Sequence, residues 1–170
     1  MDLLLNCDLG EAAGGDQLAA EAQVMPFIDQ ANIACGFHAG NPQTMDQTLV
    51  LAKQHQVAVG AHPSYPDKFN FGRQSMTMTS PDLIACLNYQ IVSLEKNAKQ
   101  HAIDLDYVKP HGALYNDMMV NGHLRSAVMA SVADSSCSSL MLQATAHQET
   151  HRQEAEMFGI QLIFEVFADR

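Results

Sequence analysis

Three histidines in this chain follow short apolar segments and stand beside glycine or proline. His38 follows Gly36-Phe37, His62 precedes a proline, and His111 lies two residues after Lys109. A neutral imidazole can bind a divalent metal ion, and an imidazole can also exchange protons near neutral pH. The three histidines therefore predict either an open metal site or acid–base chemistry, and the sequence does not choose between the two.

Asp8 and Lys109 place charges of opposite sign at similar positions, directly after or at the end of an apolar segment. A carboxylate there can act as a base, bind a metal or cap the turn before Gly10. An ammonium group there can stabilise negative charge that develops on a carbonyl or phosphoryl oxygen. The predicted catalytic residues are Asp8, His38, His62, Lys109 and His111. If a metal is present, its predicted ligands are Asp8, His38 and His62.

Six segments have the composition of strands, and most are continuous apolar runs: residues 3–7, 31–35, 57–60, 105–109, 140–143 and 161–166. Such runs are typical of parallel strands buried on both faces. Helical patterns lie between them, most clearly after Asn41-Pro42 and after Ser80-Pro81, with others near 16–25, 121–134 and 147–158. Alternating strands and helices predict an α/β fold, either a closed barrel or an open doubly wound sheet.

In both architectures the carboxyl ends of parallel strands meet at one mouth, where ligands bind. The predicted catalytic residues follow the first four strands and should therefore meet. Arg73 lies in a long loop rich in glycine and proline that could fold over this mouth and bind a carboxylate or phosphate.

Composition narrows the class of protein. The chain has 170 residues, with 19 acidic and 9 basic side chains, and we expect a single domain over residues 1–170. The acidic excess argues against nucleic acid or an anionic membrane as a partner. Four widely spaced cysteines and an N-terminus without an export signal predict a cytoplasmic protein. The chain contains no P-loop, dinucleotide, zincin or serine-hydrolase motif.

Four longer stretches stand out: Asn6-Cys7-Asp8-Leu9-Gly10-Glu11, residues 31–40, residues 60–67, and residues 108–116 with the sequence Val-Lys-Pro-His-Gly-Ala-Leu-Tyr-Asn. Together they resemble the LamB/YcsF family, the A subunits of bacterial ATP-dependent 5-oxoprolinase. Their length and order make the resemblance specific.

The resemblance implies a distorted β/α barrel related to polysaccharide deacetylases and seven-stranded in the family. By the same comparison the chain is expected to be truncated at its C-terminus and to lack the last strands. It also implies hydrolysis of the lactam of 5-oxoproline to glutamate with ATP, with Mg²⁺ as the counter-ion of the nucleotide, alongside subunits B and C. The expected substrate-binding residues are Asn6, Glu11, Asn32, Arg73 and Tyr115.

Two alternatives remain at this stage. The chain could be a stand-alone metal-dependent deacetylase or amidohydrolase, in which a bound ion generates hydroxide. It could also be a non-catalytic domain that docks other subunits. Because the P-loop is absent, ATP would bind to a partner protein or in an unusual pocket.

Overall fold

The computed structural model describes residues 3–11 and 15–168. These residues form one sheet of six parallel strands whose spatial order is their order in the chain, β1-β2-β3-β4-β5-β6. The strands are β1 (Asn6–Leu9), β2 (Gln30–Ala34), β3 (Ala58–His62), β4 (Tyr107–Val108), β5 (Ser139–Gln143) and β6 (Gln161–Glu165). The predicted parallel α/β fold is confirmed.

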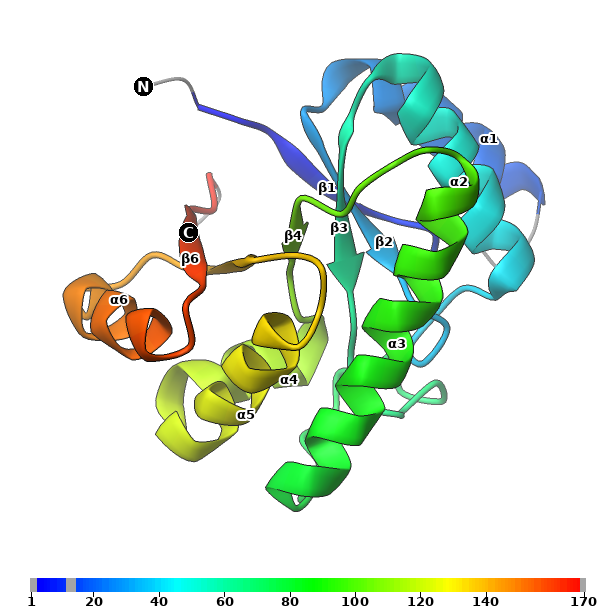
Figure 1. Ribbon diagram of the computed structural model, residues 1–170. Coiled ribbons are helices and arrows are strands. Elements are labelled where there is room, and N and C mark those ends of the chain that lie inside the picture. The colour runs from blue at the N-terminus through cyan, green and yellow to red at the C-terminus, as the bar shows by residue number, and fades with distance from the viewer. Residues whose placement is uncertain (1–2, 12–14, 169–170) are drawn as a thin grey trace.

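Helices connect the strands and cover the sheet (Figure 1). They are α1 (Gly15–Val24), the short 3₁₀ helix η1 (Met25–Phe27), α2 (Pro42–His55), α3 (Ser80–Gln100), α4 (Gly112–Val120), α5 (Gly122–Ala133) and α6 (Gln148–Met157). Within the described ranges, none of them combines the length and the apolar character needed to span a bilayer.

Local sequence explains where the two longest helices begin. The Asn41 side chain accepts hydrogen bonds from the backbone N–H groups of Gln43 and Thr44, and Thr44 bonds back to Asn41, which forms a capping box for α2. The Thr79 hydroxyl caps α3 by accepting from the N–H of Asp82, and proline follows each cap within two residues. The apolar stripe of α3 is buried and packs on β3.

The sheet is strongly curled, and a single side chain demonstrates it. Lys109, directly after β4, donates hydrogen bonds both to Asp8 on β1 and to Glu165 at the end of β6. In a flat sheet β1 and β6 would lie about 24 Å apart, at about 4.8 Å for each of five strand spacings. The carboxylates of Asp8 and Glu165 can both reach Lys109 Nζ only if the sheet curves so that β1 and β6 approach each other. The structure is therefore a partial barrel, with β1 and β6 at its two open edges among the described residues.

Several predicted bounds differ from the structure, and one helix was missed. The fourth strand spans only Tyr107–Val108 instead of residues 105–109, and the third spans Ala58–His62 instead of residues 57–60. The first strand begins at Asn6 rather than at Leu3, because the ladder with β2 starts at the pair Asn6 and Gln30, and residues 3–5 are exposed. Helix α4 (Gly112–Val120) was not predicted. Its apolar residues come in two runs of three, 113–115 and 118–120, instead of recurring along one stripe, so the periodic signal is weak.

Gly60 in β3 makes room for the ring of Tyr107 in β4. A Cβ atom at Gly60 would lie 2.2 Å from Tyr107 Cε2. The Tyr107 hydroxyl donates to Asn32 Oδ1 at 2.6 Å, and Asn32 in turn donates to Asp8. A glycine inside a strand thus supports the orientation of a predicted catalytic carboxylate.

We expect Gly60→Ala to destabilise the protein by about 3 kcal/mol or more, because the ring cannot move without breaking its bond to Asn32. Urea unfolding followed by circular dichroism measures the change. The double variant Gly60→Ala with Tyr107→Leu should recover part of the loss, since the clashing ring is gone. An unfolding midpoint of Gly60→Ala equal to that of the parent chain would contradict the close packing of Gly60 against Tyr107.

Candidate functional site

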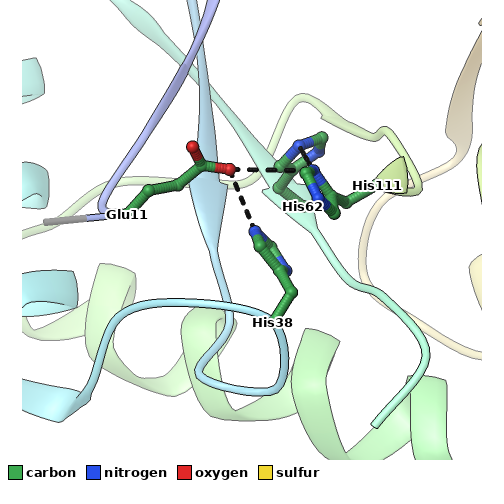
Figure 2. A group of neighbouring side chains, drawn as sticks. All are labelled: Glu11, His38, His62 and His111. Carbon is green, nitrogen blue, oxygen red and sulfur yellow. Dashed lines mark hydrogen bonds and ion pairs between the residues drawn. The ribbon is translucent and has the colours of Figure 1, made fainter. Parts of the chain in front are cut away.

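The carboxyl ends of the strands form a compact polar site. His38 follows β2, His62 ends β3, and Lys109 and His111 follow β4. All four are buried, with exposed fractions of 1%, 1%, 7% and 5%. Glu11, two residues beyond β1, directs its carboxylate towards the histidines, as Figure 2 shows.

The three histidines contact one another. His62 Nε2 lies 3.0 Å from His111 Nδ1, and the rings of His38 and His111 stack with centroids 3.8 Å apart. Glu11 Oε1 is 3.0 Å from His38 Nε2 and 3.7 Å from His111 Nδ1. This group of four side chains is called the histidine cluster below.

Backbone carbonyls accept hydrogen bonds from the outward-facing ring nitrogens of His62 and His111. His62 Nδ1 donates to the carbonyl of Lys109 at 2.7 Å, and His111 Nε2 donates to the carbonyl of Phe71 at 2.9 Å. The ring of Phe71 also meets His38 and His111 edge-on. The loop that carries Phe71 therefore folds over the cluster.

A second group surrounds the ammonium of Lys109. Its Nζ donates to Asn6 Oδ1 at 3.0 Å, to Asp8 Oδ1 at 3.2 Å and to Glu165 Oε1 at 2.8 Å. All three protons of the ammonium group therefore have an acceptor within the protein.

Two further residues complete the lysine group. Asn32 donates to both Asn6 and Asp8 at 2.7 Å, and the Tyr115 hydroxyl donates to Glu165 Oε2 at 2.8 Å. The bonds of Asn32 fix the carboxylate of Asp8 on β1, and the bond of Tyr115 fixes that of Glu165 on β6.

Asp8 and His62 join the two groups, with Asp8 Oδ2 3.5 Å from His62 Nε2. Burial alone would raise the pKa of Asp8, but the charge and hydrogen bond that His62 contributes when it is protonated, together with Lys109 and Asn32, outweigh it and hold this pKa well below its ordinary value. Asp8 is therefore ionised at neutral pH.

His111 and His38 are in the neutral form at pH 7, because the pKa of each is lowered. Burial, followed by repulsion from His62 and His38 when those rings are protonated, lowers the pKa of His111 to about 4. Burial likewise lowers the pKa of His38, against the opposing effect of Glu11. Imidazoles in this state can accept a proton or bind a metal ion.

Most of the predicted site residues meet in this structure. The five predicted catalytic residues and four of the five predicted substrate-binding residues lie in the two groups: Asp8, His38, His62, Lys109, His111, Asn6, Glu11, Asn32 and Tyr115. Arg73 is separate, because its exposed guanidinium lies over the ring of Phe71, 5.2 Å from its centroid. Its role in substrate binding stays a prediction.

Three site residues were absent from the predicted sets. Glu165 stands at the end of β6, and nothing in the sequence pairs it with Lys109. Tyr107 lies within β4 and donates a hydrogen bond to Asn32, but an aromatic residue inside a strand is normally interpreted as part of the hydrophobic core. Phe71 contributes its backbone carbonyl, and because every residue has one, the sequence does not single it out.

The donor atoms suited to a metal ion form a set that differs from the predicted one. Glu11, His38, His62 and His111 each offer one ligand atom, and these atoms all lie within 4.8 Å of one another. Asp8, predicted as a ligand in place of Glu11 and His111, instead shares its oxygens between Lys109, Asn32 and His62.

Comparison with known sequences decides the family. The sequence model of the LamB/YcsF family matches residues 3–170. The chain belongs to the LamB/YcsF family.

Similar LamB/YcsF sequences carry a consistent description. A protein from Pseudomonas fluorescens, named as the A subunit of 5-oxoprolinase, is 49% identical over 169 residues, which covers 99% of this chain and 68% of that protein. The protein of the same name from Vibrio campbellii is 46% identical over 168 residues, covering 99% and 66%. The chain thus spans about two thirds of the length of these relatives.

Solved structures agree on the fold. The lactam utilization protein from Thermus thermophilus superposes with a TM-score of 0.87 at 34% identity, covering 100% of this chain and 68% of that one. A protein described as a putative cellobiose-phosphate cleavage protein from Enterococcus faecalis, at a TM-score of 0.61 and 13% identity, shares the fold alone. The expected β/α barrel architecture is confirmed, here as a partial barrel of six strands.

Proposed function

We propose that this LamB/YcsF chain is the A subunit of a 5-oxoprolinase, which hydrolyses the lactam of 5-oxoproline to glutamate together with subunits B and C. The observation that carries the proposal is the similarity along nearly the whole chain to proteins named as the A subunit of this enzyme. The site supports it, because a buried group of neutral imidazoles and an ionised carboxylate suits acid–base chemistry on an amide.

The chemistry explains why ATP would be needed. Resonance makes a lactam carbonyl a poor electrophile, and its ring nitrogen is a poor leaving group. Transfer of the γ-phosphoryl group of ATP to the amide oxygen, with release of ADP, would remove both obstacles. Water would then attack the ring carbon, the C–N bond would break with the nitrogen leaving as an amine, and a second water would hydrolyse the resulting acyl phosphate to glutamate and phosphate. In this proposal Mg²⁺ accompanies ATP, and a partner protein holds the nucleotide, because this chain has no P-loop.

His62 is the group best placed to accept a proton from the attacking water. Its Nδ1 is committed to the carbonyl of Lys109, so Nε2 is the free base, and Asp8 lies 3.5 Å away to stabilise the imidazolium that forms. Asp8 itself is a weak base, because its pKa is held so low. Its proposed role is therefore to stabilise charge on His62.

Lys109 has a positioning role in this proposal. Its three hydrogen bonds to Asn6, Asp8 and Glu165 leave it no proton for a substrate oxygen, so it orients Asp8 instead of contacting the reacting atoms. Arg73, exposed on the loop that covers the histidines, is the proposed partner of the substrate carboxylate.

The test is reconstitution with candidate B and C subunits. Adding this chain should raise the rate of 5-oxoproline-dependent ATP hydrolysis above the rate of the B and C pair, measured as phosphate release. The matched control omits 5-oxoproline. A rate that does not change when the chain is added would remove the proposed function.

A stand-alone metal-dependent amide hydrolase is the second candidate, because three imidazoles and a carboxylate converge at the histidine cluster. The two functions differ in their need for ATP. Amide hydrolysis by the isolated chain with a metal ion and without ATP would favour this second function.

A further inference from the structure

We propose that Glu11, His38, His62 and His111 form a binding site for one divalent transition-metal ion, with Zn²⁺ as the best match. The inference goes beyond the proposed function and can be tested without any substrate or partner. An ion bound here would use the Nε2 atom of His62, so His62 could not also accept a proton while the ion is bound.

The outer hydrogen bonds determine where two of the imidazoles carry their protons. A carbonyl oxygen can only accept, so the contact of His62 Nδ1 with the carbonyl of Lys109 assigns the proton to Nδ1 and leaves Nε2 bare. The contact of His111 Nε2 with the carbonyl of Phe71 assigns the proton to Nε2 and leaves Nδ1 bare. The bare atoms are the two that face each other.

These two bare nitrogens lie only 3.0 Å apart, and a carboxylate oxygen of Glu11 lies 3.7 Å from one of them. Lone pairs at this distance repel unless a positive centre lies between them. The centre can be an additional proton on His62 or His111, or it can be a metal ion. A proton would create an imidazolium beside Asp8 and Glu11, at 3.5 Å from His62 Nε2 and 3.7 Å from His111 Nδ1, whereas a metal ion would be bound by all the converging atoms at once.

The surroundings resemble the outer shell of a metal site. Histidine ligands of metals nearly always donate their second N–H to a carbonyl or carboxylate, as His62 and His111 do here. His38 departs from this pattern: within the described residues its Nδ1 has no hydrogen-bond partner, and its Nε2 donates to Glu11 Oε1 at 3.0 Å. Binding of an ion at Nε2 therefore requires the proton of this ring to move to Nδ1.

The loop above the cluster holds the rings in place before any ion binds. A Cβ at Gly72 would lie 2.9 Å from His38 Cβ and 3.0 Å from His111 Cδ2, so the loop backbone lies directly against both residues. The carbonyl of Gly72 accepts a hydrogen bond from the N–H of Ala113 at 2.9 Å, which ties the loop to the start of α4. The donor set is therefore preorganised.

Donor chemistry selects the ion. Three imidazole nitrogens and one carboxylate oxygen suit Zn²⁺ and other late first-row divalent ions better than Mg²⁺ or Ca²⁺, which prefer oxygen ligands. Around tetrahedral zinc, ligands at about 2.0–2.1 Å from the metal lie about 3.4 Å from one another. The closest contacts in the cluster, 3.0 Å to 3.7 Å, bracket that spacing.

The test uses the whole chain, stripped of metal with a chelator and then titrated with Co²⁺, which reports four-coordinate binding through its visible absorption. We expect one Co²⁺ per chain, displaced by one Zn²⁺. Glu11→Gln and His111→Ala should each weaken binding about 100-fold or more, since the first removes the anionic charge of a ligand and the second removes an imidazole ligand. His55→Ala, an exposed histidine at the end of α2, is the matched control and should bind like the parent chain.

Two further measurements keep the outcome decisive. Circular dichroism establishes that each variant is folded, and Glu11→Gln, at a partly exposed residue, serves if His111→Ala does not fold. Asp8→Asn should retain the Co²⁺ spectrum, and its loss would overturn the proposed ligand set. A folded parent chain that binds no Co²⁺ or Zn²⁺ would assign a shared proton to His62 and His111 and overturn the metal site.

Discussion

Replacing Lys109 with methionine is expected to destabilise the protein by about 3–5 kcal/mol, because it leaves the buried carboxylate of Glu165 without its counter-charge. Glu165 is 7% exposed, and its Oε1 atom accepts from Lys109 at 2.8 Å. Asn6 and Asp8 would also lose a donor. The same ammonium joins β1, β4 and β6, so its loss should loosen the curl of the sheet.

Urea unfolding of the purified chain measures this effect, and two variants sharpen it. Lys96→Met, at an exposed position on α3, is the matched control and should change stability by less than about 0.5 kcal/mol. Adding Glu165→Gln to Lys109→Met should restore part of the stability, since the uncompensated charge is removed. If Lys109→Met unfolds at the same urea concentration as Lys96→Met, Lys109 does not connect the strands as described.

Replacing His62 with asparagine is expected to lower 5-oxoproline hydrolysis by the reconstituted complex by about 10²- to 10⁴-fold, the usual contribution of a positioned acid–base group. An asparagine amide can still donate to the carbonyl of Lys109, so the fold should be kept. The base that faces Asp8 and His111 is lost. The loss should appear in kcat at saturating 5-oxoproline more than in KM.

Steady-state kinetics of glutamate formation gives this result, with His55→Asn as the control for an exposed histidine. Circular dichroism spectra of the two variants should match that of the parent chain. A His62→Asn complex that retains full kcat would remove His62 from the chemistry and transfer the role of base to another member of the cluster.

Much of this site could be predicted from the sequence, because one rule of parallel sheets carries the argument. Continuous apolar segments predict parallel strands, and the residues that follow such strands meet at one mouth. That rule brought His38, His62, Lys109 and His111 together from separate stretches of chain, and the structure places them in contact.

The remainder depends on geometry that the sequence does not encode locally. The pairing of Lys109 with Glu165 requires the curl of the whole sheet. The carbonyl of Phe71, which sets the tautomer of His111, comes from a loop whose path depends on its packing. The sequence does not tell whether Asp8 or Glu11 supplies the carboxylate of the metal-donor set. That depends on how the chain turns between the end of β1 and Glu11, and strand patterns do not specify such a turn.

The most direct test is the amount of glutamate that subunits B and C form from 5-oxoproline and ATP in the presence and absence of this chain. The account predicts that glutamate forms only when the chain is added, and that the chain with His62→Asn supports almost none. Equal glutamate formation without the chain, or with the His62→Asn chain, would contradict it.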